Sequence, residues 1–279
     1  MQKRESASTG ILRSFLLAFL LLIAPFPLLS LSADLIEGDS QSAETAGKEL
    51  RMALLGDSMT WIGGENFDNP KGWTYYLADL PVKATSYARS GATWTNTSET
   101  HSDTEAYSKV LDPDNVIFNQ ALRLIKDGGN PDIILIYAGT NDAWFESRRP
   151  GMLSSDIIPG EAVYAGSDPS EFTTLASSIY LTCSLLSQSF PEAQIVLLTP
   201  VHSGKIPPER ITAVSDMIEK TASKLGIPTV RGDKLIPFSH NREKKQPFKY
   251  TYDGVHSNPE GARLIADCII ANIIQPALN

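Results

Sequence analysis

The sequence predicts an α/β protein built on a parallel β-sheet with helices on both faces. Short apolar runs alternate with longer stretches of helical periodicity along the 279 residues. The runs are continuous, as in parallel strands that are buried on both faces, and 133–138 is the clearest of them. Polar, glycine-containing segments follow three of the runs, at the strand ends where sheets of this kind bind ligands. With 42% apolar and 20% charged residues, the chain is expected to form one large domain.

The strands are expected where apolar residues run without interruption and then stop at glycine or polar residues. These segments are about 50–55, 82–87, 133–138, 194–199 and 229–231. Helices are expected between them, at 72–80, 116–126, 171–189, 209–225 and 259–274. Pro81 and Gly128 end the first two helices, and Pro259 suits the first turn of the last. The polar stretches 95–114 and 143–170 lack periodicity and are predicted to be functional surface loops.

The first 33 residues are predicted to be an export signal. Basic residues precede a short apolar core at 15–24, two prolines end it, and small residues near its end offer a cleavage site. The core is shorter than the about 20 residues that cross a bilayer, which leaves an uncleaved anchor as the alternative. Residues 34–48 are polar and acidic and are expected to form a tether, with the folded domain at 49–279. The protein is therefore expected to be secreted or periplasmic.

Charge and cysteine content narrow the function classes. Cleavage would remove three basic residues and one acidic residue and move the net charge from −8 to −10. Such an acidic chain is a poor candidate for nucleic-acid binding, and we expect no stable membrane insertion after cleavage. Cys183 and Cys268 lie in apolar helical patterns, where two buried free thiols fit better than a disulfide, although export would allow one.

A serine, a histidine and an aspartate have the arrangement that acyl transfer needs. Ser58 follows the first strand in Gly56-Asp57-Ser58 and can act as the nucleophile. His256 can act as its base, because imidazole exchanges protons near neutrality. Asp253 lies three residues earlier and can orient the ring. Taken alone, Ser58 could merely cap a helix.

Donors for the oxyanion are expected from two further strand ends. We predict the backbone N–H groups of Ser58 and Gly91 and the side-chain amide of Asn141. Gly91 has no Cβ, so a substrate can approach its backbone closely. A turn glycine and an Asx turn are the ordinary alternatives for Gly91 and Asn141. Right-handed crossovers would nevertheless bring all three strand ends to one rim.

Taken together, these motifs resemble the SGNH hydrolase family, also called GDSL esterases and lipases. Ser58 lies in Gly-Asp-Ser, Gly91 in Ser-Gly-Ala, Asn141 in Gly-Thr-Asn-Asp and His256 in Asp-Gly-Val-His, in the family's order. The resemblance spans residues 54 to about 266. It implies a flavodoxin-like three-layer α/β/α sandwich with a five-stranded parallel sheet. It also implies ester hydrolysis by a serine mechanism without metal or cofactor.

Three tryptophans are predicted to line the substrate cleft. Trp61, Trp94 and Trp144 each follow one of the motifs within a few residues. Sugar rings stack on such side chains, but an aromatic acyl pocket would use the same residues. Because neither polar insertion offers an apolar lid, we predict an esterase that removes short acyl groups, such as acetyl, from a small-molecule or carbohydrate ester. A lipase, lysophospholipase or thioesterase for longer chains is one alternative, and a catalytically silent glycan-binding module is another.

Overall fold

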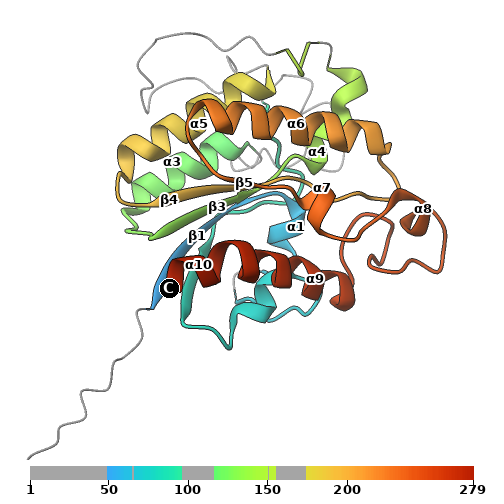
Figure 1. Ribbon diagram of the computed structural model, residues 1–279, viewed down its shortest axis with the longest axis horizontal. Helices are drawn as coiled ribbons and strands as arrows, with labels where there is room; N and C mark the ends of the chain where they lie inside the picture. The colour runs from blue at the N-terminus through green and yellow to red at the C-terminus, as the bar shows by residue number, and fades with distance from the viewer. Residues whose placement is uncertain (1–48, 65, 96–115, 150, 155–173) are drawn as a thin grey trace, which may run out of the picture. The chain divides into compact units, whose positions relative to one another are not determined.

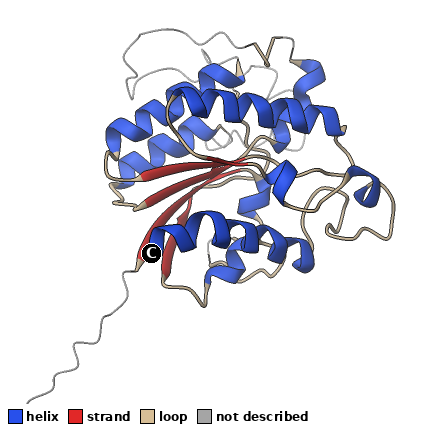
Figure 2. Cartoon of the chain, viewed as in Figure 1, coloured by secondary structure: helices blue, strands red, loops and turns tan. Residues whose placement is uncertain are grey.

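The fold is described here from a computed structural model, which defines residues 49–64, 66–95, 116–149, 151–154 and 174–279. Five parallel strands form one sheet in the order β2-β1-β3-β4-β5, the order of flavodoxin-like proteins. Helices cover both faces (Figures 1 and 2), so the predicted three-layer α/β/α class is confirmed. The predicted signal and tether lie outside the described residues, as do most of the two polar insertions.

The main elements lie close to their expected positions. The strands are β1 (Leu50–Gly56), β2 (Val82–Ser86), β3 (Ile133–Tyr137), β4 (Gln194–Leu198) and β5 (Thr229–Val230). The helices α3 (Ile117–Asp127), α5 (Leu175–Ser189) and α6 (Pro208–Lys224) cover one face. The other face is covered by a C-terminal helical run, which comprises α9 (Pro259–Ile269), η5 (Ile270–Ile274) and α10 (Gln275–Leu278).

Short helices account for the differences from the expected elements. The helix expected at 72–80 is a 3-10 helix, η1 (Trp73–Leu77). Among the described residues, five others were not expected, namely α4 (Thr140–Phe145), η3 (Glu146–Arg148), α7 (Gly232–Leu235), α8 (His240–Glu243) and α1 (Ser58–Trp61). Segments of one turn are too short to show helical periodicity, and the first two lie where a loop was expected.

The sheet separates two apolar clusters. Alternate strand residues point to opposite faces, so Ala53 and Ile134 pack beneath α3, α5 and α6, whereas Leu54 and Leu135 face α9. Both faces are buried, which explains the continuous apolar strands of the sequence. By length and composition, Pro259–Leu278 could cross a membrane. Its residues Ile265, Ala266 and Ile269 are fully buried in the second cluster, however, as in the core helix of a globular domain.

The two cysteines lie in different clusters and are both free thiols. Cys183 is buried in α5, and Cys268 packs half-buried against the opposite face of the sheet. The expectation of free thiols is confirmed, with the difference that Cys268 is only partly buried. The sheet lies between the clusters that contain them, which excludes a disulfide between them in this fold.

Candidate active site

The strand order brings the ends of β1 and β3 together at the point where the sheet reverses its direction of growth. From β1 the chain proceeds outward to β2, and from β3 it proceeds the other way to β4 and β5. Such a switch point opens a crevice at the carboxyl ends of the strands. Ser58 directly follows β1 here, and Asn141 follows β3.

Ser58 is the first residue of the short helix α1 (Ser58–Trp61) and is only 5% exposed. Asp57 caps this helix, and its carboxylate accepts the N–H of Met59 at 2.9 Å. The other carboxylate oxygen accepts the N–H of Thr140, the first residue of α4, at 3.3 Å. Asp57 therefore holds together the two strand ends that carry Ser58 and Asn141.

The end of β1 is held by a buried glutamine that the sequence analysis did not identify. Gln120 of α3 accepts the N–H of Gly56 at 2.8 Å and donates to its carbonyl at 2.9 Å. A Cβ on Gly56 would lie 2.3 Å from the carbonyl oxygen of Tyr137, so only glycine allows β1 and β3 to lie this close here. The nucleophile is thus placed by a backbone contact with β3 and a side-chain clamp from α3.

His256 joins Ser58 to Asp253 in one hydrogen-bonded chain. Its Nε2 lies 3.0 Å from the Oγ of Ser58, although 198 residues separate the two. Its Nδ1 lies 2.7 Å from Asp253 Oδ2, and Asp253 Oδ1 accepts the backbone N–H groups of Val255 and His256 at 2.9 and 2.8 Å. Burial alone would raise the pKa of Asp253, but these hydrogen bonds outweigh it and lower that pKa below its ordinary value. Asp253 therefore stays ionised and keeps the ring oriented.

A buried glutamate anchors the loop that carries His256. Glu243 of α8 is fully buried and accepts the N–H of Tyr250 at 3.0 Å and the hydroxyl of Thr251 at 2.6 Å. The backbone N–H of Gly204 donates to the carbonyl of Gly254 at 2.7 Å. Glu243 was missed because no motif marks it in the sequence.

The predicted oxyanion donors lie around the same crevice. Among the described residues, the N–H groups of Ser58 and Gly91 have no hydrogen-bond acceptor. Gly91 has a φ of 79°, a left-handed conformation that glycine adopts readily. The Nδ2 of Asn141 donates to the carbonyl of Ala92 at 3.0 Å, which ties α4 to the Gly91 turn. A second N–H remains on that amide for an oxyanion.

Asp142 fastens the same turn from the other side of α4. Its carboxylate accepts the N–H groups of Trp94 and Thr95 at 3.0 and 3.1 Å and the Thr95 hydroxyl at 2.9 Å. Arg149 completes the group by donating to that hydroxyl at 2.8 Å. Asp142 therefore has a structural role, because it positions the segment that contains Gly91.

Asp57, directly before Ser58, is a fully buried acid with a shifted pKa. Burial raises its pKa to about 6, although hydrogen bonds from Met59 and Thr140 and the nearby His256 act to lower it. Within the described residues, no three His, Cys, Asp or Glu side chains are grouped as ligands of a metal ion.

The three tryptophans differ in exposure. Trp61 at the end of α1 is 45% exposed and Trp144 in α4 is 42% exposed, so both are accessible to a ligand. Trp94 is only 1% exposed and packs in the apolar cluster beneath α3. The expectation that Trp94 lines the cleft is therefore wrong, because the hydrogen bonds to Asp142 turn this segment inward.

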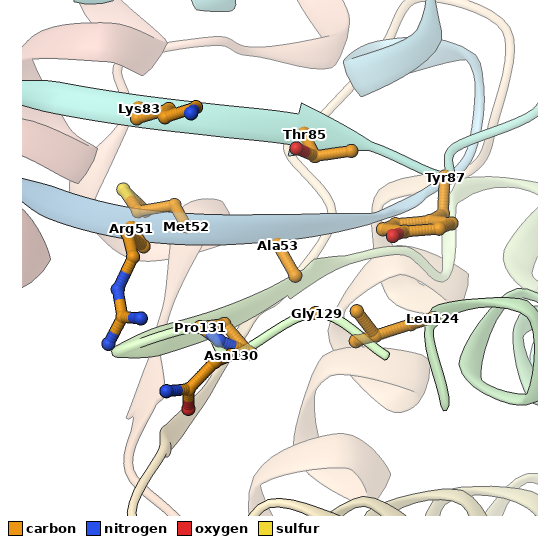
Figure 3. A pocket seen from close by; sticks show the side chains of 10 residues that line it. All are labelled: Arg51, Met52, Ala53, Lys83, Thr85, Tyr87, Leu124, Gly129, Asn130 and Pro131. Atoms are coloured by element: carbon orange, nitrogen blue, oxygen red, sulfur yellow. The ribbon is translucent and has the colours of Figure 1, made fainter. Parts of the chain in front are cut away.

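Two surface hollows differ in whether predicted site residues line them. One of about 820 Å³ is lined by Trp61 and by Tyr252, whose ring stacks on that of His256 at 5.8 Å. Another groove, shown in Figure 3, runs along β1 and β2. It is lined by Arg51 and Lys83 and by Pro131 before β3, and it contains no predicted site residue.

The sequence profile of the GDSL-like Lipase/Acylhydrolase family matches residues 54–264. The chain belongs to this family. It is accordingly a carboxylic ester hydrolase, and its resemblance to SGNH hydrolases is confirmed. A search of curated protein sequences gave no significant match.

Solved structures share the hydrolase's fold at low sequence identity. A possible lipase from Chitinophaga pinensis has a TM-score of 0.55 and 19% identity, covering 83% of this chain and 100% of its own. An acetyl xylan esterase has a TM-score of 0.53 and 18% identity, with coverage of 80% and 100%. A putative GDSL-like lipase from Bacteroides ovatus has a TM-score of 0.51 and 16% identity, with coverage of 82% and 99%. At these identities the likeness concerns the fold alone.

Proposed function

We propose that the hydrolase is a serine esterase that uses Ser58, His256 and Asp253 as its catalytic triad. The observation that carries this proposal is the chain of hydrogen bonds from Asp253 through His256 to Ser58, at 2.7 and 3.0 Å. Such a chain joins a nucleophile, a base and an orienting carboxylate, which are the groups that acyl transfer requires.

The geometry gives each atom a role in the reaction. Nε2 of His256 takes the proton as the Oγ of Ser58 attacks the ester carbonyl, and returns it to the leaving alcohol. The oxyanion that forms is stabilised by the N–H groups of Ser58 and Gly91 and by the amide of Asn141. Water then attacks the acyl-enzyme with His256 again as base, which releases the acid and restores Ser58.

The proposed substrate is a short acyl ester, chiefly acetyl, on a carbohydrate. Trp61 and Trp144 follow Ser58 and Asn141 by one helical turn and offer exposed aromatic faces, as stacking on sugar rings requires. One of the structural neighbours is an acetyl xylan esterase, which supports the same class of substrate. We further propose that residues 1–33 direct export, that 34–48 form a tether, and that the domain at 49–279 acts outside the cytoplasm.

The test of the mechanism is covalent labelling combined with turnover. The protein should hydrolyse p-nitrophenyl acetate, and a fluorophosphonate should add to the peptide that contains Ser58, as seen by mass spectrometry. Ser58→Ala should lose both reactions while keeping its circular dichroism and melting temperature. Labelling elsewhere with full loss of activity would overturn the assignment of Ser58, and a chelator should leave the rate unchanged.

A series of acyl lengths tests the substrate. The value of kcat/KM should fall steeply from acetyl to octanoyl p-nitrophenyl esters, and acetylated oligosaccharides should release acetate. A preference for octanoyl or longer esters would replace this proposal with a lipase, because burial of each CH₂ in a suitable pocket contributes about 0.8 kcal/mol.

A further inference from the structure

The hydrolase is acidic overall, yet the two hollows that flank its proposed triad are basic. The net charge of the chain is −8. One hollow, here called the Trp61 cleft, has Lys71 and Arg89 as its charged lining residues. The other, here called the Trp144 hollow, has Arg148, Lys205 and Arg210. Among the described lining residues of both hollows, none is acidic.

The Trp61 cleft adjoins the nucleophile and the base directly. Trp61 lies one turn after Ser58 in α1, and Tyr252 stacks on His256. The ammonium of Lys71 lies 4.7 Å from the centre of the Tyr252 ring. The carbonyl of Lys71 accepts the hydroxyl of Ser257 at 2.6 Å, so its backbone is fixed to the loop of the base. A ligand in this cleft therefore meets aromatic faces and a positive charge together.

The Trp144 hollow also adjoins the loop of the proposed base. Trp144 lies one turn after Asn141 in α4, and Lys205 follows Gly204, which is bonded to Gly254. A Cβ on Gly254 would lie 3.6 Å from both Cγ and Cε of Lys205, which shows how closely that side chain covers the loop between Asp253 and His256. Arg210 is paired with Glu146 at 3.5 Å.

Lys71 and Lys205 come from unrelated segments and keep their charges available. Neither forms an ion pair within the described part of the chain, whereas Arg231 alone has three acidic partners. The carboxylate of Asp253 is occupied by three N–H groups and is turned toward His256. Two unpaired cations close to the loop of the proposed base, in an acidic protein, create a local field that attracts anions.

We propose that the substrate is an anionic carbohydrate ester, in which carboxylate groups on sugar units next to the acylated one bind Lys71 and Lys205. This inference rests on the proposed esterase function and specifies its substrate. The aromatic faces hold the sugar rings, and the two lysines select for acidic units on both sides of the scissile ester. Because these charges are solvent-exposed, salt should screen them: the Debye length is about 30 Å at 0.01 M and about 3 Å at 1 M.

The test compares two acetylated oligosaccharides of equal length, one of galacturonic acid and one of xylose. At about 0.01 M ionic strength, kcat/KM should be about 10-fold higher for the acidic substrate, and about 1 M salt should abolish that advantage. Equal values for the two substrates at low salt would overturn the inference. A preference for an anionic lysophospholipid over both sugars would overturn it too, in favour of a lipid headgroup.

Single substitutions test whether Lys71 and Lys205 cause the preference for the acidic substrate. Lys71→Gln and Lys205→Gln should each lower kcat/KM for the acidic substrate about 3-fold and together about 10-fold, as expected for exposed charge pairs. The neutral substrate should change much less. Lys83→Gln is the matched control, since Lys83 lies on β2 in the groove of Figure 3 and should leave both values unchanged. An equal loss in the control would refute a local role of the two lysines.

The outcomes of these assays distinguish the inference of an anionic substrate from the proposed esterase function on which it rests. Hydrolysis of neutral p-nitrophenyl acetate that depends on Ser58, without any preference for the acidic sugar, would leave the esterase standing and remove the anionic substrate. Absence of any hydrolysis of that ester by the unmodified protein would remove both.

Discussion

The nucleophile and the base of this hydrolase are held in position in opposite ways. Ser58 is 5% exposed and follows a strand end that is clamped by Gln120, which lies 64 residues away from Gly56 in sequence. The side chain of His256 is 28% exposed, and the carboxylate that orients it lies three residues away. The nucleophile is thus placed by contacts between distant segments. The ring of the base is oriented by a local turn, within a loop that Glu243 and Gly204 anchor.

This difference predicts which mutations lower the stability of the protein and which lower its catalytic activity. Buried hydrogen bonds between distant segments form only when the sheet and α3 have assembled, and losing one leaves polar groups stranded in the core. Hydrogen bonds within a turn at the surface can be exchanged for water at little cost. We therefore expect mutations of the residues that clamp the Ser58 strand end to lower the free energy of unfolding. Mutations within the turn from Asp253 to His256 should lower mainly kcat.

The largest expected effect is the loss of either reacting side chain. Ser58→Ala and His256→Ala should each lower kcat on p-nitrophenyl acetate by about 10⁴-fold or more, and the double variant should be little worse, because the two act as a unit. The two ends should differ in rescue: added imidazole should restore part of the activity of His256→Ala, whose site is open, and none of that of Ser58→Ala. Additive losses in the double variant would contradict a shared mechanism.

The next largest loss of activity is expected for Asn141, which follows β3 on the side of the nucleophile. Asn141→Ala should lower kcat by about 10²–10³-fold with a smaller change in KM, as for the loss of one oxyanion donor. Steady-state kinetics on an acetate ester measure both values. If KM rises while kcat holds, Asn141 binds the ground state and is not an oxyanion donor.

The contrast also explains what the sequence could predict. The strands, the fold class and the residues Ser58, Gly91, Asn141 and His256 carry local signals, since each follows a strand or precedes a helix in a short motif. Asp253 was accessible for the same reason, because its partner lies three residues away. A reader of the sequence needs only neighbouring residues to find these features.

The rest depends on contacts between distant segments. Gln120 looks like any polar residue of an amphipathic helix until α3 is packed against β1. Trp94 was predicted to face the cleft because it follows Gly91, but Asp142, 48 residues away, turns its segment inward. Lys71 and Lys205 have no signal at all in sequence, because only the fold brings them both close to the loop that carries His256.

The buried nucleophile side should also give the protein a particular pH dependence. The pKa of Asp57 is about 6 in the fold against an ordinary 3.8. Below the ordinary value the acid is protonated in both states; as pH rises toward 6 the unfolded chain ionises first, so stability falls. Above about pH 6, the raised pKa of Asp57 lowers the free energy of unfolding by about 3 kcal/mol in full. Asp253 acts with the opposite sign, because its lowered pKa adds stability that disappears only as the pH falls below its ordinary range.

Urea unfolding at about pH 4 and pH 7 measures this contribution when wild type is compared with Asp57→Asn. The free energy of unfolding of the wild type should fall between these pH values by about 2 kcal/mol more than that of the variant, because the unfolded chain is already partly ionised at pH 4, and other ionisable groups cancel in the comparison. A difference that does not change with pH would show that Asp57 ionises normally in the folded protein.

The smallest expected change in stability belongs to the most direct test of the contrast, which pairs Gln120→Met with Asp253→Asn. Methionine fills the space of glutamine but leaves the N–H and carbonyl of Gly56 without their buried partner, so the free energy of unfolding should fall by about 2 kcal/mol. Asparagine at 253 can still accept the backbone N–H groups of its turn, and the site is partly exposed, so stability should change by less than about 0.5 kcal/mol. Activity should show the reverse order, since Asp253→Asn lowers kcat by up to about 10⁴-fold through the wrong orientation of His256. If both variants lose stability equally, the base end is held by the fold as firmly as the nucleophile, and the contrast fails.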